Sequence, residues 1–172
     1  MTITPRILRA IVYGANDGII TTFAVVAGVN GAHLASSVII ILGVANMVAD
    51  GFSMGVSDYL GERSQRLAEG KISRPTKTAE TGLTTFIAFL FAGTLPLLPY
   101  FAKSLRVPLP DASLFLFSMI TTALALFAIG ASRTHFINGK WYKNGLEVLT
   151  IGAVAASLAY VLGFLVEKLV LS

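Results

Sequence analysis

Cysteine is absent from this chain of 172 residues, and charged side chains are scarce. The absence of cysteine excludes disulfide bonds, thiolate metal sites and redox-active cysteines. Charged residues make up 13% of the chain, against roughly 25% in an ordinary soluble domain, while 55% of the residues are hydrophobic and the mean hydropathy is +0.76. These proportions are typical of an integral membrane protein.

The chain also lacks the patterns of the common enzyme classes. It contains no phosphate-binding loop, no cofactor motif and no nucleophile paired with a base. The absence of any Glu-x-x-His pair excludes a ferritin-like metal module. We therefore expect no enzymatic activity and no bound cofactor. The net charge of +4 falls in short loops, so nucleic acid is not expected as a partner.

Five apolar segments are long enough to cross a bilayer, for which about 20 predominantly apolar residues suffice. The predicted helices run over 7–30, 37–60, 79–101, 112–132 and 147–169. Because they use most of the chain, the sequence predicts an all-α polytopic membrane protein with a single transmembrane domain over residues 1–172.

Basic residues are unequally divided between the two sides of this arrangement. The side of the N-terminus carries Arg6, Arg9, Arg63, Arg66, Lys71, Arg74, Lys77, Arg133, Lys140 and Lys143, whereas the other side carries Lys103, Arg106 and Lys168. The positive-inside rule therefore predicts a cytoplasmic N-terminus and an outside C-terminus. Trp141 and Tyr142, between two lysines, indicate an interfacial contact with anionic membrane lipid.

Ionisable residues interrupt the first two predicted helices. Asp17 lies in the first helix, and Asn46, Asp50, Met54 and Asp58 recur every four positions on the second, so they share one face of it. At about 1.5 Å per residue, Asp17 and the acid at position 50 each lie roughly 15 Å from the cytoplasmic boundary. Two carboxylates are thus predicted near the middle of the bilayer on consecutive helices.

A pair of carboxylates in a medium of low dielectric constant must be protonated, matched to a cation or open to water. Protons and a divalent cation would compete for Asp17 and Asp50. Asn46 adds an oxygen and Met54 a soft sulfur, a set of ligands that suits Fe²⁺ or Mn²⁺ better than Mg²⁺ or Ca²⁺. The alternative is a structural polar contact that holds the two helices together.

Three further features lie on the first two predicted helices. Asp58 and Glu62, near the cytoplasmic boundary, are either solvated charges or part of a path for a cation or a proton. Met47 is best interpreted as core packing. Two GxxxG pairs, Gly14 with Gly18 and Gly51 with Gly55, indicate close helix packing, either within the chain or in a dimer.

The stretches NDGIITTFAVVAGVNGA (16–32) and ADGFSMGVSDYLGERSQ (49–65) resemble the first two helices of the vacuolar iron transporter family. This family moves Fe²⁺ and Mn²⁺ out of the cytosol. The resemblance implies a homodimeric bundle of five helices, with a metal path between the protomers and exchange of the metal for protons. It also implies that Asp17 and Met54 line this path.

The chain departs from the family pattern in two places. Plant members have a glutamate two turns before the methionine, where this chain has Asn46, and the acid here is Asp50, one turn before. Plant and fungal members also insert an acidic metal-binding domain between the second and third helices. Here residues 61–78 are short and net basic, so that domain is absent, which fits a compact form in a prokaryotic plasma membrane.

Together these features predict a membrane transporter that exports Fe²⁺ or Mn²⁺ in exchange for protons. Its predicted metal residues are Asp17, Asn46, Asp50 and Met54. Two alternatives stay open: a proton-coupled carrier of a small organic solute, which calls for an enlarged cavity lined by aromatic side chains, and a membrane scaffold that transports nothing.

Overall fold

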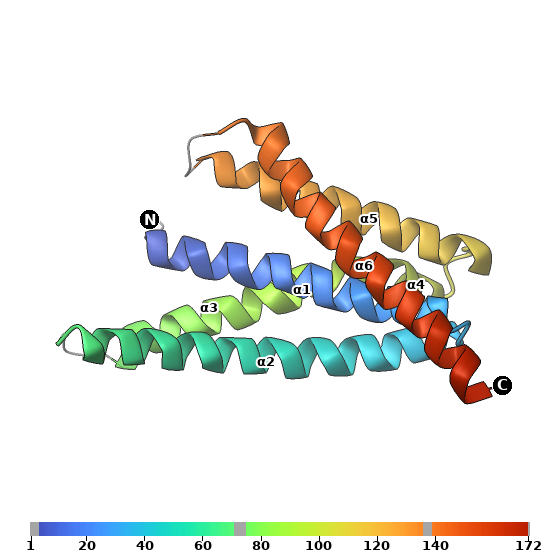
Figure 1. Cartoon of the computed structure of the whole chain (residues 1–172), viewed down its shortest axis with the longest axis horizontal. Coiled ribbons are helices and arrows are strands. Elements are labelled where there is room, and N and C mark those ends of the chain that lie inside the picture. The colour runs from blue at the N-terminus through green and yellow to red at the C-terminus, as the bar shows by residue number, and fades with distance from the viewer. Residues whose placement is uncertain (1–3, 71–74, 136–138, 172) are drawn as a thin grey trace.

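The computed structural model describes residues 4–70, 75–135 and 139–171, and the described part contains helices and no strand. Figure 1 shows long helices that run along a common axis, with the two ends of the chain at opposite ends of the bundle. The elements are α1 (Pro5–Gly31), α2 (Ser36–Ala68), α3 (Pro75–Gly93), η1 (Leu95–Leu97), α4 (Leu98–Ser104), α5 (Asp111–Ser132), η2 (Arg133–His135) and α6 (Trp141–Leu171).

Five helical segments in the described residues are long and apolar enough to cross a membrane, which confirms the predicted all-α fold with five spans. Two helices exceed their predicted bounds, because α2 continues to Ala68 and α6 begins at Trp141. The 33 residues of α2 extend over about 50 Å, well beyond a hydrocarbon core of roughly 30 Å. Hydropathy delimits only the part within lipid, whereas a helix can continue into water.

The third span differs from the continuous helix predicted over 79–101. Regular α-helix stops at Gly93, and the short η1 and α4 carry the chain on to Ser104. Pro96 and Pro99 cause this break, because proline has no N–H to donate to the preceding turn. The hydroxyl of Ser118 on α5 donates to the carbonyl of Pro96 at 2.6 Å, which satisfies a polar backbone group inside the bundle.

Helix α1 is the centre of the bundle and packs against α2, α3, α5 and α6. A Cβ atom at Gly14 or Gly18 would overlap the backbone carbonyls of Thr85 and Phe89, so glycine permits the close approach of α1 and α3. Gly55 lies in the same way against the backbone of α3. Both predicted glycine pairs therefore serve packing within the chain.

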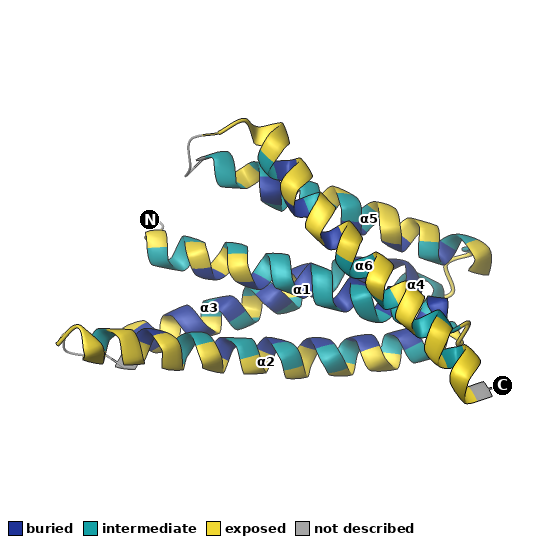
Figure 2. Ribbon diagram, viewed as in Figure 1, coloured by how far each residue is buried: buried dark blue, intermediate teal, exposed yellow. Residues whose placement is uncertain are grey.

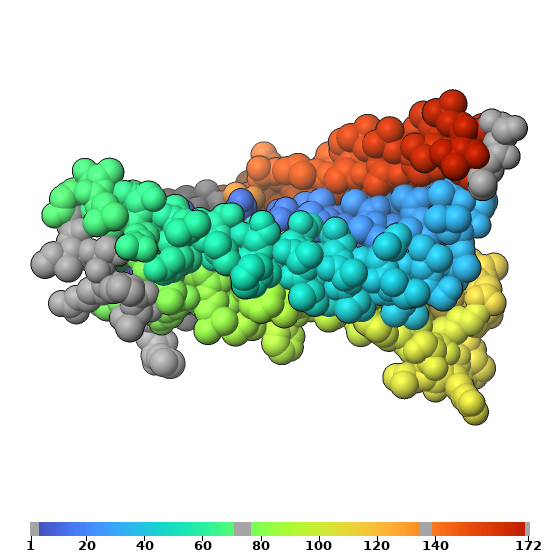
Figure 3. All heavy atoms as spheres, turned by 90° about the horizontal axis from the view of Figure 1, so that it is seen from below, coloured from blue at the N-terminus to red at the C-terminus, as the bar shows by residue number. Residues whose placement is uncertain are grey.

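Burial is unequal among the spans. Figure 2 shows buried residues concentrated where α1 and α3 meet the other helices, whereas α6 is exposed along most of its length. Only 11% of the most apolar stretch of α6 is buried, against 44% for α1. Seen from below, α1 is visible in a strip between α2 and α6 (Figure 3). Asp17, the predicted site residue of α1, therefore lies in a helix that most of the fold packs around.

Candidate metal path on the α1–α2 seam

The surface between α1 and α2, here called the α1–α2 seam, brings the two predicted acids together. Asp17 on α1 and Asp50 on α2 are both half-buried, and the charge of Asp50 acts on Asp17. The helices run in opposite directions, so two acids at matching depth can face each other. Packing of α1 and α2 therefore brings two carboxylates near enough to act on each other electrostatically.

Neither of these carboxylates has a basic partner. Among the residues that the structure describes, no lysine, arginine or histidine forms an ion pair with Asp17 or Asp50. The amide of Asn46 donates to Oδ2 of Asp50 at 3.1 Å, and the hydroxyl of Thr21 donates to the backbone carbonyl of Asp17, not to its carboxylate. Two carboxylates thus lack a basic partner in a region where an unpaired charge is costly.

The two methionines of α2 have different surroundings. Met47 is buried, and its sulfur would lie 3.1 Å from a Cβ placed on Gly93, so this side chain fills the contact between α2 and α3. Met54 is half-buried and follows Asp50 by one helical turn. Core packing is therefore confirmed for Met47, while the role of Met54 as a metal ligand stays a prediction.

The predicted set can supply two carboxylates, the carbonyl oxygen of Asn46 and a thioether. Within residues 4–70, 75–135 and 139–171, no three side chains of histidine, aspartate or glutamate gather closely enough to hold a metal ion. The predicted set would therefore consist of two carboxylates and two neutral ligands. Such a set can neutralise a divalent cation without the crowded carboxylates of a permanent metal site, and the metal in question would be cargo.

Asp58 lies further along the seam, at the end where α1 begins. Its Oδ1 is 2.9 Å from Nη2 of Arg9, and the hydroxyl of Thr85 on α3 donates to Oδ2 at 2.7 Å. The side chain of Asp58 is only 9% exposed. Three helices thus meet at this carboxylate, and the interpretation of Asp58 as a solvated charge is wrong.

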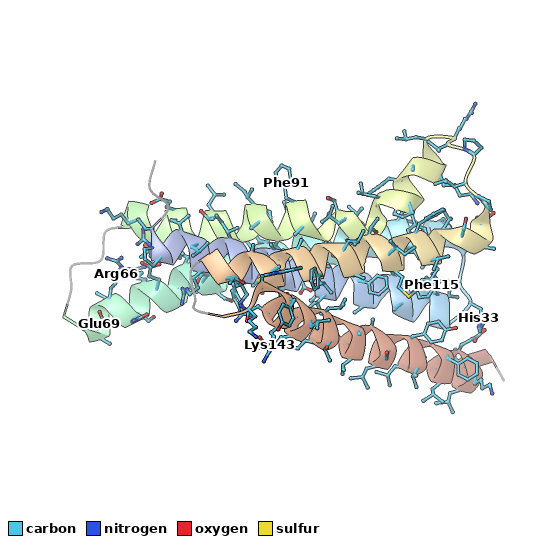
Figure 4. The ribbon with its side chains drawn as sticks, turned by 90° about the horizontal axis from the view of Figure 1, so that it is seen from above. His33, Arg66, Glu69, Phe91, Phe115 and Lys143 are labelled. Atoms are coloured by element: carbon cyan, nitrogen blue, oxygen red, sulfur yellow. The ribbon has the colours of Figure 1, made fainter. Side chains whose placement is uncertain are left out.

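Glu62 lies one turn beyond Asp58 and is also buried, with 8% of its side chain exposed. Nη1 of Arg6 on α1 is 2.7 Å from Oε1, and Arg66 on α2 donates to the same oxygen from Nε at 3.0 Å and Nη2 at 2.8 Å. Figure 4 shows Arg66 and Glu69 at the far end of α2. Solvated charge is therefore wrong for Glu62 as well.

Arg6, Arg9 and Thr85 are partners of these acids that hydropathy does not reveal. The two arginines serve only to orient the chain, because hydropathy does not distinguish a loop residue from one in the first turn of a helix. The spacing of the residues could have indicated the pair of Arg9 and Asp58. Arg9 precedes Asp17 by eight residues and Asp58 follows Asp50 by eight, so on antiparallel neighbouring helices Arg9 and Asp58 lie at the same level if Asp17 and Asp50 do.

A separate apolar cavity of about 470 Å³ lies between α1, α5 and α6. Its lining includes Phe23, Phe115 and Tyr160, as expected for a carrier of organic solutes, but neither Asp17 nor Asp50. In Figure 4, Phe115 lies on the α5 side of this region. The cavity and the acids are therefore distinct, so proton coupling through these acids has no direct link to the cavity.

Comparison with known proteins adds an independent observation. A family model described as the VIT family matches residues 8–74 and 67–164. A protein named vacuolar iron transporter 1 from Arabidopsis thaliana is 25% identical over 223 residues, which covers 94% of this chain and 87% of the relative. A vacuolar iron transporter from Plasmodium berghei is 25% identical over 224 residues, which covers 93% and 82%.

The lengths of these matches are informative. Both alignments are longer than the 172 residues of this chain, so each relative carries residues within the aligned stretch that this chain lacks. The two parts of the family match meet at residues 67–74, in the connection between α2 and α3. The helices of the seam lie within the first matched part.

Proposed function

This chain belongs to the VIT family, and we propose that it exports Fe²⁺ or Mn²⁺ from the cytosol in exchange for protons. Transport of a metal ion is supported by the relatives named as iron transporters. The observation that carries the proposal is a pair of half-buried carboxylates, Asp17 and Asp50, that act on each other electrostatically and have no basic partner among the described residues.

The membrane potential explains why protons enter the proposal. Moving a divalent cation outward against a negative interior costs about 4.6 kcal/mol per 100 mV, twice the value for a single charge. Two protons moving inward for each metal would cancel this electrical cost. Asp17 and Asp50 supply two titratable sites, and a metal displaces protons from carboxylates when it binds. Competition for the same oxygens would therefore couple the two fluxes.

The neutral ligands support the choice of metal. The oxygen of Asn46 stays free to bind a cation while its amide donates to Asp50. Met54 adds a thioether, which Mg²⁺ and Ca²⁺ do not use but Fe²⁺ tolerates. Fe²⁺ and Mn²⁺ therefore fit these residues better than the more abundant hard cations do.

We further propose that the protein is a short homodimeric form without a cytosolic metal-binding domain. The residues that the relatives have in addition would fall at the connection between α2 and α3, where the two parts of the family match meet. We place the N-terminus in the cytoplasm of a prokaryotic cell and the protein in its plasma membrane. The excess of basic residues on the N-terminal side supports this orientation.

The proposal is tested by flux into inside-out proteoliposomes with and without a pH gradient. We expect Fe²⁺ and Mn²⁺ uptake that depends on the pH gradient. It should carry no net current, because two protons move for each metal ion. A current that reverses with voltage as expected for an uncompensated double charge would contradict exchange for two protons. The absence of flux from well-folded protein would contradict metal transport and favour the scaffold alternative.

The carrier of organic solutes is the second candidate, because an apolar cavity with aromatic side chains does exist between α1, α5 and α6. It predicts that a bulky residue in the cavity, such as Ala153→Phe, abolishes transport, while metal export on the seam predicts that Ala153→Phe leaves Fe²⁺ flux within about twofold. Val154→Phe, a neighbouring exposed position outside the lining, is the matched control.

A further inference from the structure

Residues on α1 and α2 interact with one another at three levels along the seam. Moving toward the N-terminus of α1 and the C-terminus of α2, the pairs are Asp17 with Asp50, Arg9 with Asp58, and Arg6 with Glu62. Eight residues separate the first pair from the second on each helix, which is about 12 Å. The ion pairs therefore lie on the route from one end of the seam to the two unpaired acids.

The two ion pairs, here called the end pairs, close this route. The carboxylates of Asp58 and Glu62 are 9% and 8% exposed, so the end of the seam is occupied by side chains. The guanidinium groups of Arg9 and Arg6 also place positive charge in front of the acids. A cation at this end would be repelled by these guanidinium groups.

Each acid of the end pairs keeps a second partner that does not come from α1. Thr85 on α3 donates to Asp58 at 2.7 Å, and Arg66 on α2 donates to Glu62 at 2.8 Å. If α1 moves away, each carboxylate keeps one hydrogen-bond partner. Neither becomes a buried charge without a partner, which would be costly. The side chain of Arg9 is already 61% exposed and can turn into water. The ion pairs between α1 and α2 can therefore break without leaving a buried carboxylate unpartnered.

Starting from the proposed function, we infer that the end pairs Arg9–Asp58 and Arg6–Glu62 form a gate, closed in this structure, between the N-terminal side of the membrane and the acids Asp17 and Asp50. Opening separates the arginines of α1 from the acids of α2. The separation exposes the carboxylates of Asp58 and Glu62, which attract the arriving cation. When the gate closes again, the arginines return to these carboxylates after the cation has passed toward Asp17 and Asp50. Arginine and metal therefore alternate at this end of the seam.

The gate can be tested without any metal, because the native chain contains no cysteine. Met54→Cys places a single thiol on α2 between Asp50 and Asp58, on the far side of the end pairs. The full chain is reconstituted in liposomes, and a positively charged, membrane-impermeant thiol reagent is added on the side that carries an N-terminal epitope tag. We expect Arg6→Gln with Arg9→Gln to accelerate labelling at least tenfold.

Two controls separate a gate from general loosening. Arg63→Gln removes an exposed arginine from the same end of α2 and must leave the labelling rate within twofold. Ser64→Cys places a thiol outside the gate, and this thiol must label equally fast with and without the double substitution of Arg6 and Arg9. Equal labelling of Met54→Cys in all backgrounds, or equal acceleration by Arg63→Gln, would overturn the gate.

A charge swap keeps the test decisive if the double arginine variant folds poorly. Arg9→Asp alone should open the seam by repelling Asp58, and Arg9→Asp with Asp58→Arg should restore slow labelling by reversing the pair. Failure of the swap to restore slow labelling would overturn the gate. Since labelling involves no metal, gated labelling without metal flux would remove the proposed function and leave the gate in place.

Discussion

The middle of the α1–α2 seam and its end contain acids of the same kind in opposite surroundings. Asp17 and Asp50 act on each other electrostatically and have no basic partner among the described residues, whereas Asp58 and Glu62 are paired with arginines at 2.9 and 2.7 Å. A carboxylate paired with a cation of the same chain is satisfied by the fold. A pair of carboxylates without such a cation must obtain a cation or protons from outside, and this difference distinguishes the proposed transport site from the structure around it.

The largest expected effect comes from removing one of the unpaired acids. Asp17→Asn keeps the size of the side chain but removes a charge and a titratable site, so we expect metal flux to fall roughly 100-fold or more while the fold is retained. Flux of Fe²⁺ and Mn²⁺ in proteoliposomes measures this loss. Asp111→Asn, an exposed acid paired with Lys103 far from the seam, is the control. Normal flux through Asp17→Asn would remove the distinction between the two pairs.

The opposite manipulation takes the cations away from a paired acid. Arg6→Gln with Arg66→Gln leaves Glu62 buried without either guanidinium, and we expect the free energy of unfolding to fall by about 2 kcal/mol. Denaturant unfolding in detergent micelles measures this change. Adding Glu62→Gln should recover part of it, because a neutral amide needs no cation. Unchanged stability would show that the arginines do not compensate Glu62.

Close packing of α1 and α3 holds Asp17 in the seam, and the glycine that follows it tests this dependence. Gly18→Ala would push a methyl group into the backbone of Phe89, so we expect a loss of about 1–3 kcal/mol in unfolding free energy. Gly61→Ala, where no atom lies within 4 Å, should be neutral or slightly stabilising. The thermal unfolding midpoints of the two variants compare these effects, and equal midpoints would contradict the packing role.

The smallest expected effect concerns the thioether near the unpaired acids. Met54→Leu should change the ratio of Fe²⁺ to Mn²⁺ flux on the order of threefold, because it removes a soft ligand while preserving volume. Met47→Leu, a buried methionine in the contact with α3, should leave the ratio unchanged. Competition flux with both metals measures the ratio. An unchanged ratio in Met54→Leu would assign this side chain to packing.

Hydropathy and spacing predicted the spans because lipid imposes the same requirement on each of them. A helix that satisfies its own backbone and about 20 apolar residues are needed whatever the neighbours are. The same reasoning located Asp17 and Asp50 at matching depth. It extended the third helix to residue 101, because hydropathy stays high through the prolines that end the regular helix at Gly93. It could not show that Ser118 of another helix satisfies the carbonyl of Pro96, because that bond joins residues distant in sequence.

The sequence by itself determined the helical fold with five membrane-spanning segments and the family, since these depend on local composition and motif. Only the tertiary structure decided which acids are compensated. Arg9 reaches Asp58 and Arg6 reaches Glu62 across two helices, and this pairing depends on the rotation and register of α1 against α2. Side-chain packing sets both quantities, and no single helix carries that information in its own periodicity.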